Sequence, residues 1–235
     1  MVNVLILKKL MVSFLSLVAG ASLIGLGAPR MIAAFVMFPS GPVIKKIQAL
    51  QPAEPEELET LIASQKRGLS WSESGSMWMD LGLAQSLLAK KKKHDSPERI
   101  QLVDDAILSL RTGLEMSPLS PFAWMRLASV ELLKAGPSPA AMSAFRLGLN
   151  MAPYEPYLAI ARIYMGMALW SDLQPDERRL ILQQARYAWN YRNGKKRLVE
   201  FVKNRPNHAN LVRAALIRTP KKLAAFEDLL KILSK

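Results

Sequence analysis

Cysteine is absent from the 235 residues, and its absence removes several classes of protein and of site. Disulfide scaffolds, thiolate zinc sites and cysteine nucleophiles all require the thiol group. The absence does not choose a compartment, because periplasmic and cytosolic domains alike can lack cysteine. Half of the residues are hydrophobic, which is too large a share for a disordered tail, so we expect a domain with a core.

Histidine is scarce as well. The two histidines, His94 and His208, lie 114 residues apart in basic polar stretches, and neither belongs to an H-E-x-x-H pattern. A zinc site needs several ligands held close together, and the sequence offers no partner for either residue. We therefore expect exposed loop histidines and no metal site.

Motifs for catalysis and for cofactor binding are also missing. Neither G-x-x-x-x-G-K-[ST] nor G-x-G-x-x-G occurs, so nucleotide binding by those loops is not expected. Ser70 lacks the second glycine of a nucleophile elbow, and the adjacent Asp104 and Asp105 would point about 100° apart on a helix. We predict no catalytic residue and no cofactor, so the chain is expected not to be an enzyme. The alternative, a helical active site, would require a cluster of buried titratable groups.

Positive charge is concentrated at the end of the chain. Residues 1–40 carry three basic side chains and no acidic one, and residues 41–177 carry 14 basic and 16 acidic side chains. Residues 178–235 carry 15 basic and three acidic side chains, and so hold +12 of the total net charge of +13. Such a field attracts anionic lipid, acidic polysaccharide, phosphorylated lipid carriers or nucleic acid. The alternative is a solvated helical surface with a positive bias.

An uncharged run of 19 residues extends from Leu10 to Ala28. At 1.5 Å per residue, a helix of this length spans about 28 Å, close to the hydrocarbon thickness of a bilayer. Lys9 and Arg30 flank the run, as is typical of a membrane span. After Pro29 the sequence is again apolar over residues 31–38, which would extend the helix past a kink or lie at the interface.

Two alternatives to a membrane anchor remain open. A cleaved signal peptide would end near Ala19-Gly20-Ala21, but the apolar run continues beyond that point and would be exposed in the mature chain. The other alternative is a buried core helix, which the charged flanks do not favour. We predict an uncleaved single-pass anchor.

The orientation of this anchor depends on the basic residues on its two sides. Lys8 and Lys9 favour a cytoplasmic amino terminus, whereas Arg30, Lys45 and Lys46 favour the opposite orientation. Because the N-terminal side is so short, we predict a protein of the bacterial inner (cytoplasmic) membrane with its helical domain in the periplasm.

The middle of the chain contains an internal repeat. The pattern Ala106-x3-Leu110-x2-Gly113-x4-Pro118 recurs as Ala141-x3-Phe145-x2-Gly148-x4-Pro153, with every position displaced by 35 residues. Upstream, Trp78-x2-Leu81-Gly82 is echoed by Trp124-x2-Leu127-Ala128. Small residues at such positions let two helices approach closely, while the large ones fill the space between them, and each proline ends the preceding helix.

These positions resemble the signature of tetratricopeptide repeats, whose period is about 34 residues. The resemblance covers residues 75–153 closely and residues 54–192 loosely. The first copy departs from the pattern through about a dozen extra residues around 90–96. The resemblance implies an all-α fold in which the N-terminal transmembrane helix is followed by a solenoid of antiparallel helix pairs.

No stretch alternates with period two, so no sheet is predicted. The organisation that we predict is a transmembrane anchor (1–40), a linker (41–55), a helical repeat domain (56–192) and basic C-terminal helices (193–235). Helices are expected over residues 56–67, 75–92, 97–116, 121–135, 139–151, 157–170, 175–192, 195–204, 206–217 and 220–234.

A second resemblance concerns the segment that follows the second repeat. Residues 152–189 contain Tyr154-Glu155-Pro156, Ala168-Leu169-Trp170 and Ala188-Trp189, and look like small single-span repeat proteins associated with bacterial exopolysaccharide biosynthesis. This resemblance implies an accessory role in polymer assembly or export, with no catalytic residues to transfer. A generic membrane-anchored repeat scaffold is the alternative.

We therefore expect function to lie in surfaces. The candidate anionic contact consists of Arg192, Lys195, Lys196 and Arg197, and the nearby aromatics Trp170, Tyr187, Trp189 and Tyr191 are either interface or core residues. The leading hypothesis is a scaffold that binds protein partners. The alternative is a protein that binds anionic lipid or nucleic acid through the basic C-terminal helices, although nucleic acid is not the partner we expect.

Overall fold

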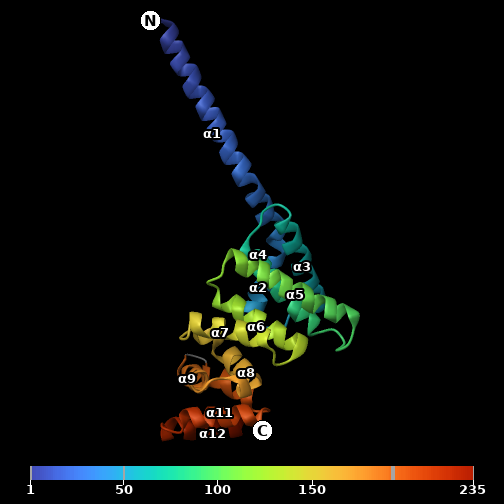
Figure 1. Cartoon of the computed structure of the whole chain (residues 1–235), viewed down its shortest axis with the longest axis vertical. Coiled ribbons are helices and arrows are strands. Elements are labelled where there is room, and N and C mark those ends of the chain that lie inside the picture. Colours follow the sequence, from blue (N-terminus) through green and yellow to red (C-terminus); the bar gives the residue numbers. More distant parts are fainter. Residues whose placement is uncertain (1, 50, 192–193, 235) are drawn as a thin grey trace. The chain divides into compact units, whose positions relative to one another are not determined.

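The computed structural model describes residues 2–49, 51–191 and 194–234, and every regular element in these ranges is a helix. The prediction of an all-α protein is therefore confirmed. The chain divides into two compact units, Met1–Met116 and Ser117–Lys235, whose helices are coloured along the sequence in Figure 1.

The first unit begins with a single long helix, α1 (Val2–Met37), most of which extends away from the other helices of its unit (Figure 1). It runs through Pro29, so the apolar residues 31–37 continue the same helix. Its large side chains are exposed, with exposed fractions of 71% at Leu17 and 74% at Phe35. The helix is long and apolar enough to cross a membrane, although a signal sequence would pass the same test. Its most apolar stretch is 0% buried, whereas the core helix of a soluble protein would be mostly buried.

A short helical segment follows where the sequence predicts a linker over residues 41–55. The 3₁₀ turn η1 (Phe38–Ser40) leads into α2 (Gly41–Gln48), and residues 51–54, which have no regular structure, precede α3 (Pro55–Leu69). Helix α2 has an apolar face. Its buried Val43, with Ile44 and Ile47, belongs to a hydrophobic cluster that also contains Leu58 and Leu61 of α3.

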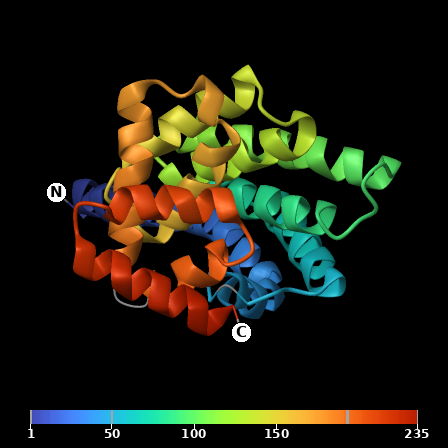
Figure 2. The ribbon, with the colours of Figure 1, turned by 90° about the horizontal axis from the view of Figure 1, so that it is seen from below.

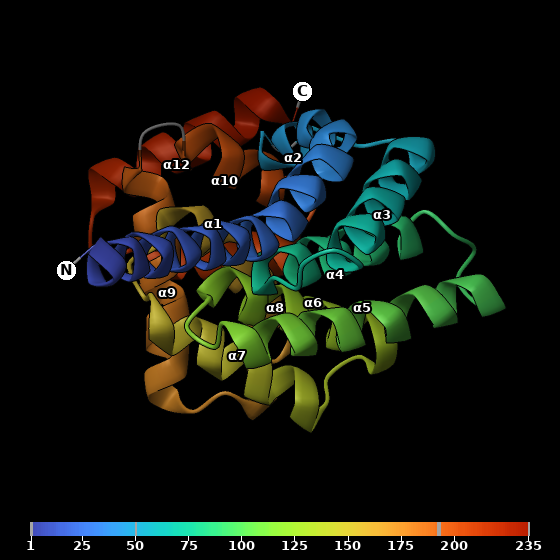
Figure 3. The same cartoon turned by 90° about the horizontal axis from the view of Figure 1, so that it is seen from above.

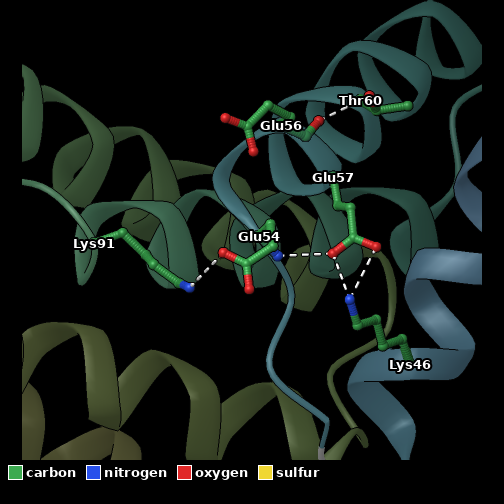
Figure 4. Close-up of polar contacts among 6 residues, drawn as sticks. All are labelled: Lys46, Glu54, Glu56, Glu57, Thr60 and Lys91. Carbon is green, nitrogen blue, oxygen red and sulfur yellow. Dashed lines mark hydrogen bonds and ion pairs between the residues drawn. The ribbon is translucent and has the colours of Figure 1, made fainter.

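Polar contacts fasten the start of α3 to the elements on both sides of it (Figure 4). The Lys46 ammonium lies 2.7 Å from Glu57 Oε2, which also accepts a hydrogen bond from the Glu54 backbone N–H at 2.7 Å. The Lys46 contact is the main reason why the pKa of Glu57 is lowered. Lys91, in the turn that follows the next helix, lies 3.6 Å from Glu54 Oε2. The Lys46 contact joins α2 to α3, and the Lys91 contact joins the start of α3 to the turn after the next helix.

The remaining helices of the first unit, α4 (Gly75–Ala89) and α5 (Pro97–Met116), pack against each other, and α4 also packs on α3 (Figure 3). Successive helices run antiparallel. The turn over residues 90–96 falls where the sequence predicts the extra residues of the first repeat copy.

The second unit is a series of shorter helices. α6 (Pro121–Ala135) and α7 (Pro139–Met151) form one pair, and α8 (Ala159–Ala168) and α9 (Pro175–Asn190) form the next. The 3₁₀ turns η2 (Pro156–Leu158) and η3 (Trp170–Asp172) flank α8. Gly136 ends α6 with φ of +69°, which is the left-handed region that glycine adopts most easily.

Three helices complete the second unit: α10 (Gly194–Val202), α11 (Pro206–Leu216) and α12 (Pro220–Leu233). They pack on α9 and on one another, and α11 and α12 lie at the red end of the colour scale (Figure 2). The buried rings of Trp189 and Phe226 meet edge to face at 5.9 Å. The basic C-terminal helices therefore share a core with α9.

Proline marks the first residue of many of these elements. A proline at this position loses no helical hydrogen bond and already has a helical φ. The elements that begin with proline are α3, η2, α5, α6, α7, α9, α11 and α12. The predicted bounds of α5, α6 and α7 match the observed ones at both ends.

Candidate functional sites

The repeat positions of the sequence lie at helix crossings inside each unit. A Cβ atom added at Gly82 would lie 2.7 Å from Leu110 Cγ and 3.0 Å from the Ala106 carbonyl oxygen, so α4 and α5 approach too closely there for a side chain. A Cβ at Gly148 of the second copy would lie 2.7 Å from Met125 Sδ on α6. Both glycines therefore permit the close packing of a helix pair.

Other repeat residues occupy the core beside these glycines. Most are less than 9% exposed: Leu81, Ala106, Leu110, Leu127, Ala128, Ala141 and Phe145. Trp78 and Trp124 are only half-buried. The indole N–H of Trp124 donates to the Pro118 carbonyl oxygen at 2.8 Å, which joins two of the repeat positions. Pro118 and Pro153 both lie two residues beyond the end of a helix, α5 and α7 respectively.

The candidate anionic contact lies at the start of α10, and its first member, Arg192, is outside the described residues. Lys195 and Lys196 are exposed, and Arg197 is half-buried. The Lys195 ammonium lies 5.4 Å from the centre of the Trp189 ring, and Lys196 Nζ lies 3.9 Å from Glu200 Oε1. Cations in the first turn of a helix oppose its dipole, so this arrangement does not stabilise α10.

Tyrosines form the clearest exposed aromatic surface of the second unit. Tyr154 and Tyr187 meet edge to face at 5.5 Å, and Tyr157 and Tyr191 meet in the same way at 5.6 Å. The exposed fractions are 70% for Tyr154, 62% for Tyr157 and 37% for Tyr191. Gln183 Nε2 donates to the Tyr187 hydroxyl at 2.8 Å. We call these four residues the tyrosine surface.

Sequence reasoning found half of this surface. Tyr187 and Tyr191 were candidates: Tyr187 lies on α9, and Tyr191 is the C-cap of that helix, with its backbone N–H donating to the Tyr187 carbonyl oxygen. It missed that Tyr154 and Tyr157 would pair with them, because that pairing depends on how the residues around η2 pack on α9. Of the two tryptophans, Trp189 is a core residue, whereas Trp170 is half-buried, with the guanidinium of Arg178 5.4 Å from the centre of its ring.

A buried arginine that the sequence did not reveal lies inside the second unit. Arg162 on α8 is 0% exposed, and its guanidinium donates to the Gly148 carbonyl oxygen at 2.8 Å and to Gln184 Oε1 at 3.1 Å. Gln184 in turn donates to the Pro153 carbonyl oxygen at 2.8 Å. Burial lowers the pKa of Arg162 to about 10, which leaves it charged at neutral pH. These contacts join α8 and α9 to the end of α7.

The two histidines have different surroundings. His94 lies in the exposed turn after α4, as predicted, with Nδ1 2.7 Å from Asp95 Oδ1. The prediction for His208 is wrong, because it lies half-buried on α11, stacked on Tyr164 and beside Phe201. Burial, and then the charge of Arg205, lowers its pKa.

The residues considered for catalysis have local partners. The Ser70 hydroxyl donates to the Arg67 carbonyl oxygen at 2.8 Å, and Asp105 accepts a hydrogen bond from Gln101 at 2.8 Å. Within the described ranges, no group of three or more histidine, aspartate or glutamate residues is placed to hold a metal ion.

Comparison with known proteins identifies no family for the chain: no protein-family model, no curated protein and no solved structure matches it. The fold and the surfaces described above are therefore the basis for assigning a role.

Proposed function

We propose that this chain is a non-catalytic scaffold or adaptor, anchored in a membrane by α1, which binds protein partners and assists bacterial polysaccharide assembly or export. The observation that carries the proposal is the tyrosine surface. Tyrosine is enriched at protein interfaces, where its ring supplies contact area and its hydroxyl supplies a hydrogen bond. Tyr154 and Tyr157 are 70% and 62% exposed, so neither is a core residue of the second unit.

The anchor is supported by the exposure of α1. Its apolar side chains are exposed over the run Leu10–Ala28, and exposing apolar surface to water costs free energy. Burying these side chains in a bilayer would remove that cost. An uncleaved span accounts for the continuation of the helix to Met37 better than a signal peptide that ends near Ala21. The chain would then stay attached to the membrane with its helical units on one side, which we propose is the periplasm.

The helix pairs α4–α5 and α6–α7 support a tetratricopeptide-like arrangement. Each pair carries its glycine at the crossing, at Gly82 and Gly113 in the first and at Gly148 in the second. Helix-pair proteins of this type bind peptides or helices of other proteins. The polysaccharide context is supported by the resemblance of residues 152–189, which include three of the four tyrosines and most of α9.

A complementation experiment tests the proposal. Deletion of the gene should reduce polymer yield or chain length, and the wild-type chain should restore both. A Tyr154→Ala/Tyr157→Ala variant should insert normally into the membrane but fail to restore them. Ile217→Ala is the matched control, because Ile217 is another exposed apolar residue of the same unit, 66% exposed. Unchanged polymer in the deletion strain would remove the polysaccharide role.

Two biochemical measurements test the anchor and its orientation. The full chain should remain in the membrane pellet after carbonate extraction and keep its N-terminal residues. Protease added to intact spheroplasts should digest the helical units, and protection of residues 41–235 would place them in the cytoplasm instead.

The alternative function, binding of an anionic surface through the C-terminal helices, is favoured by one observation. Residues 178–235 hold 15 basic side chains against three acidic ones, and Lys195 and Lys196 project from the first turn of α10 against its dipole. Flotation with anionic vesicles should then fall steeply with salt. Neutralising Lys195, Lys196 and Arg197 together should abolish it, and the same assay with nucleic acid would separate the two anionic partners.

A further inference from the structure

We infer that a groove at the C-terminal end of α1 binds one acyl chain of an anionic membrane phospholipid, with the lipid phosphate held beside Lys45. The groove lies wholly within the first unit and has a volume of about 620 Å³. This volume is in the range of sites that hold small organic ligands, about 300–1,000 Å³. The inference rests on the proposed membrane anchor.

The walls of the groove are mainly apolar and come from several elements. Met37 and Phe38 supply the end of α1 and η1, Ile44 supplies α2, and Met77 supplies α4. Methionine side chains adapt their shape, which suits a flexible hydrocarbon chain. The wall is therefore apolar enough, and soft enough, for an acyl chain.

The polar groups of the groove favour a head group that can form hydrogen bonds. Gln65 lines the groove, is 2% exposed, and its Oε1 has no hydrogen-bond partner among the residues that the structure describes. A buried amide oxygen without a partner is costly, so a ligand that donates to it would be stabilised. The glycerol hydroxyls of phosphatidylglycerol are donors of this kind.

The charge at the groove suits an anion. Lys45 lines it, and so do Ser76 and Met77 in the first turn of α4. Ser74, the N-cap of α4, makes no capping hydrogen bond. The backbone N–H groups at the positive end of this helix therefore receive no acceptor from the N-cap side chain. Asp80 also lines the groove and has a partner within the chain. The phosphate would therefore lie at the Lys45 side, away from this carboxylate.

The position of the groove along α1 suits a lipid of the surrounding bilayer. If the hydrocarbon boundary is near Arg30, Met37 lies seven residues, or about 10 Å, farther along the helix, at the level of the head groups. Phe35 and Phe38 flank this level with exposed fractions of 74% and 83%. Phenylalanine is among the apolar side chains that interfacial helices bury at the boundary between head groups and acyl chains. A lipid of this leaflet would reach the groove by bending one acyl chain toward the head-group level.

Native mass spectrometry of the full chain released from nanodiscs tests this inference. In discs of phosphatidylcholine with one fifth phosphatidylglycerol, the wild-type chain should retain one phosphatidylglycerol molecule. Lys45→Gln should lower this retention about fivefold, the factor for one cation near a lipid surface. Met77→Trp, which fills the groove, should abolish it. Lys93→Gln, in the exposed turn after α4, is the matched control and should retain lipid as the wild type does.

The outcomes distinguish this inference from the anchor itself. A chain that stays in the membrane after carbonate extraction but retains no phosphatidylglycerol leaves the anchor intact and overturns the groove. Equal retention of phosphatidylcholine, or retention that is unchanged in Lys45→Gln and Met77→Trp, also overturns it. A chain that leaves the membrane on extraction refutes the anchor, and the groove inference with it. Circular dichroism of both variants checks that lost retention does not reflect lost helix.

Discussion

Replacing Gly113 with alanine tests whether close backbone approach holds the α4–α5 pair together. A Cβ atom at this position would lie 2.9 Å from the Gly75 carbonyl oxygen and 2.8 Å from Met79 Cγ. Because the nearest polar atom belongs to the backbone, α4 itself must shift to make room. Alanine gains about 1 kcal/mol over glycine in helix propensity. Overpacking costs about 1–3 kcal/mol, so we expect a net loss of about 1 kcal/mol.

Gly68→Ala is the matched control. Its Cβ would meet only side-chain atoms, Met37 Cγ at 2.8 Å, Met37 Sδ at 3.0 Å and Met77 Sδ at 3.4 Å. Methionine side chains can rotate away, so the propensity gain should dominate and leave this variant at least as stable as the wild type.

Hydrogen exchange followed by mass spectrometry on peptides of α4 and α5 measures the difference locally. A local probe is needed because a chain of two units does not unfold in one step. A loss of about 1 kcal/mol corresponds to about fivefold faster exchange. The reasoning is refuted if the amides of α4 and α5 exchange as slowly in Gly113→Ala as in the wild type. It is also refuted if Gly68→Ala accelerates exchange more than Gly113→Ala does.

Three further predictions concern the second unit and its helix ends. Arg162→Met should destabilise α8 and α9 by about 2–4 kcal/mol, because it leaves the buried Gln184 Oε1 and a backbone carbonyl without donors, and hydrogen exchange in these helices should accelerate. The pKa of His208 is lowered in the folded chain, so the unfolded chain takes up the proton at a higher pH than the folded chain does. The free energy of unfolding should therefore fall as the pH drops below about 6.5. In urea titrations, His208→Phe should remove that part of the pH dependence. Ser138→Ala should cost about 1 kcal/mol in the same titrations, because Ser138 caps α7 through the Ala141 N–H, whereas Ser74→Ala, which removes no capping bond, should change little.

Local sequence signals were enough for much of the helical structure. Pro121 and Pro139 follow serine caps, Ser120 and Ser138, so both helix starts are determined within a few residues. Helix α2 was missed because it has only eight residues, and its helical state depends on packing its apolar face against α3. A segment this short would not be stable as a helix on its own.

The candidate sites were harder to predict, since they depend on contacts between distant residues. Arg162 lies in an apolar stretch, and one of its acceptors is a backbone carbonyl that carries no signal in the sequence. Tyr154 and Tyr157 were visible as residues, but their pairing with α9 was not. The groove near Met37 combines side chains from α1, η1, α2, α3 and α4, and no spacing rule connects them. The membrane span and the binding partners remain predictions.

The proline starts of the helices affect how the chain can change in length. Each such helix restarts at its own proline, so a residue inserted before that proline leaves the orientation of the following helix unaffected. A residue inserted inside a helix turns everything after it by about 100° and moves the apolar stripe off the core. Natural variants should therefore gain or lose residues in turns such as 90–96, while the lengths of α5, α6 and α7 stay constant.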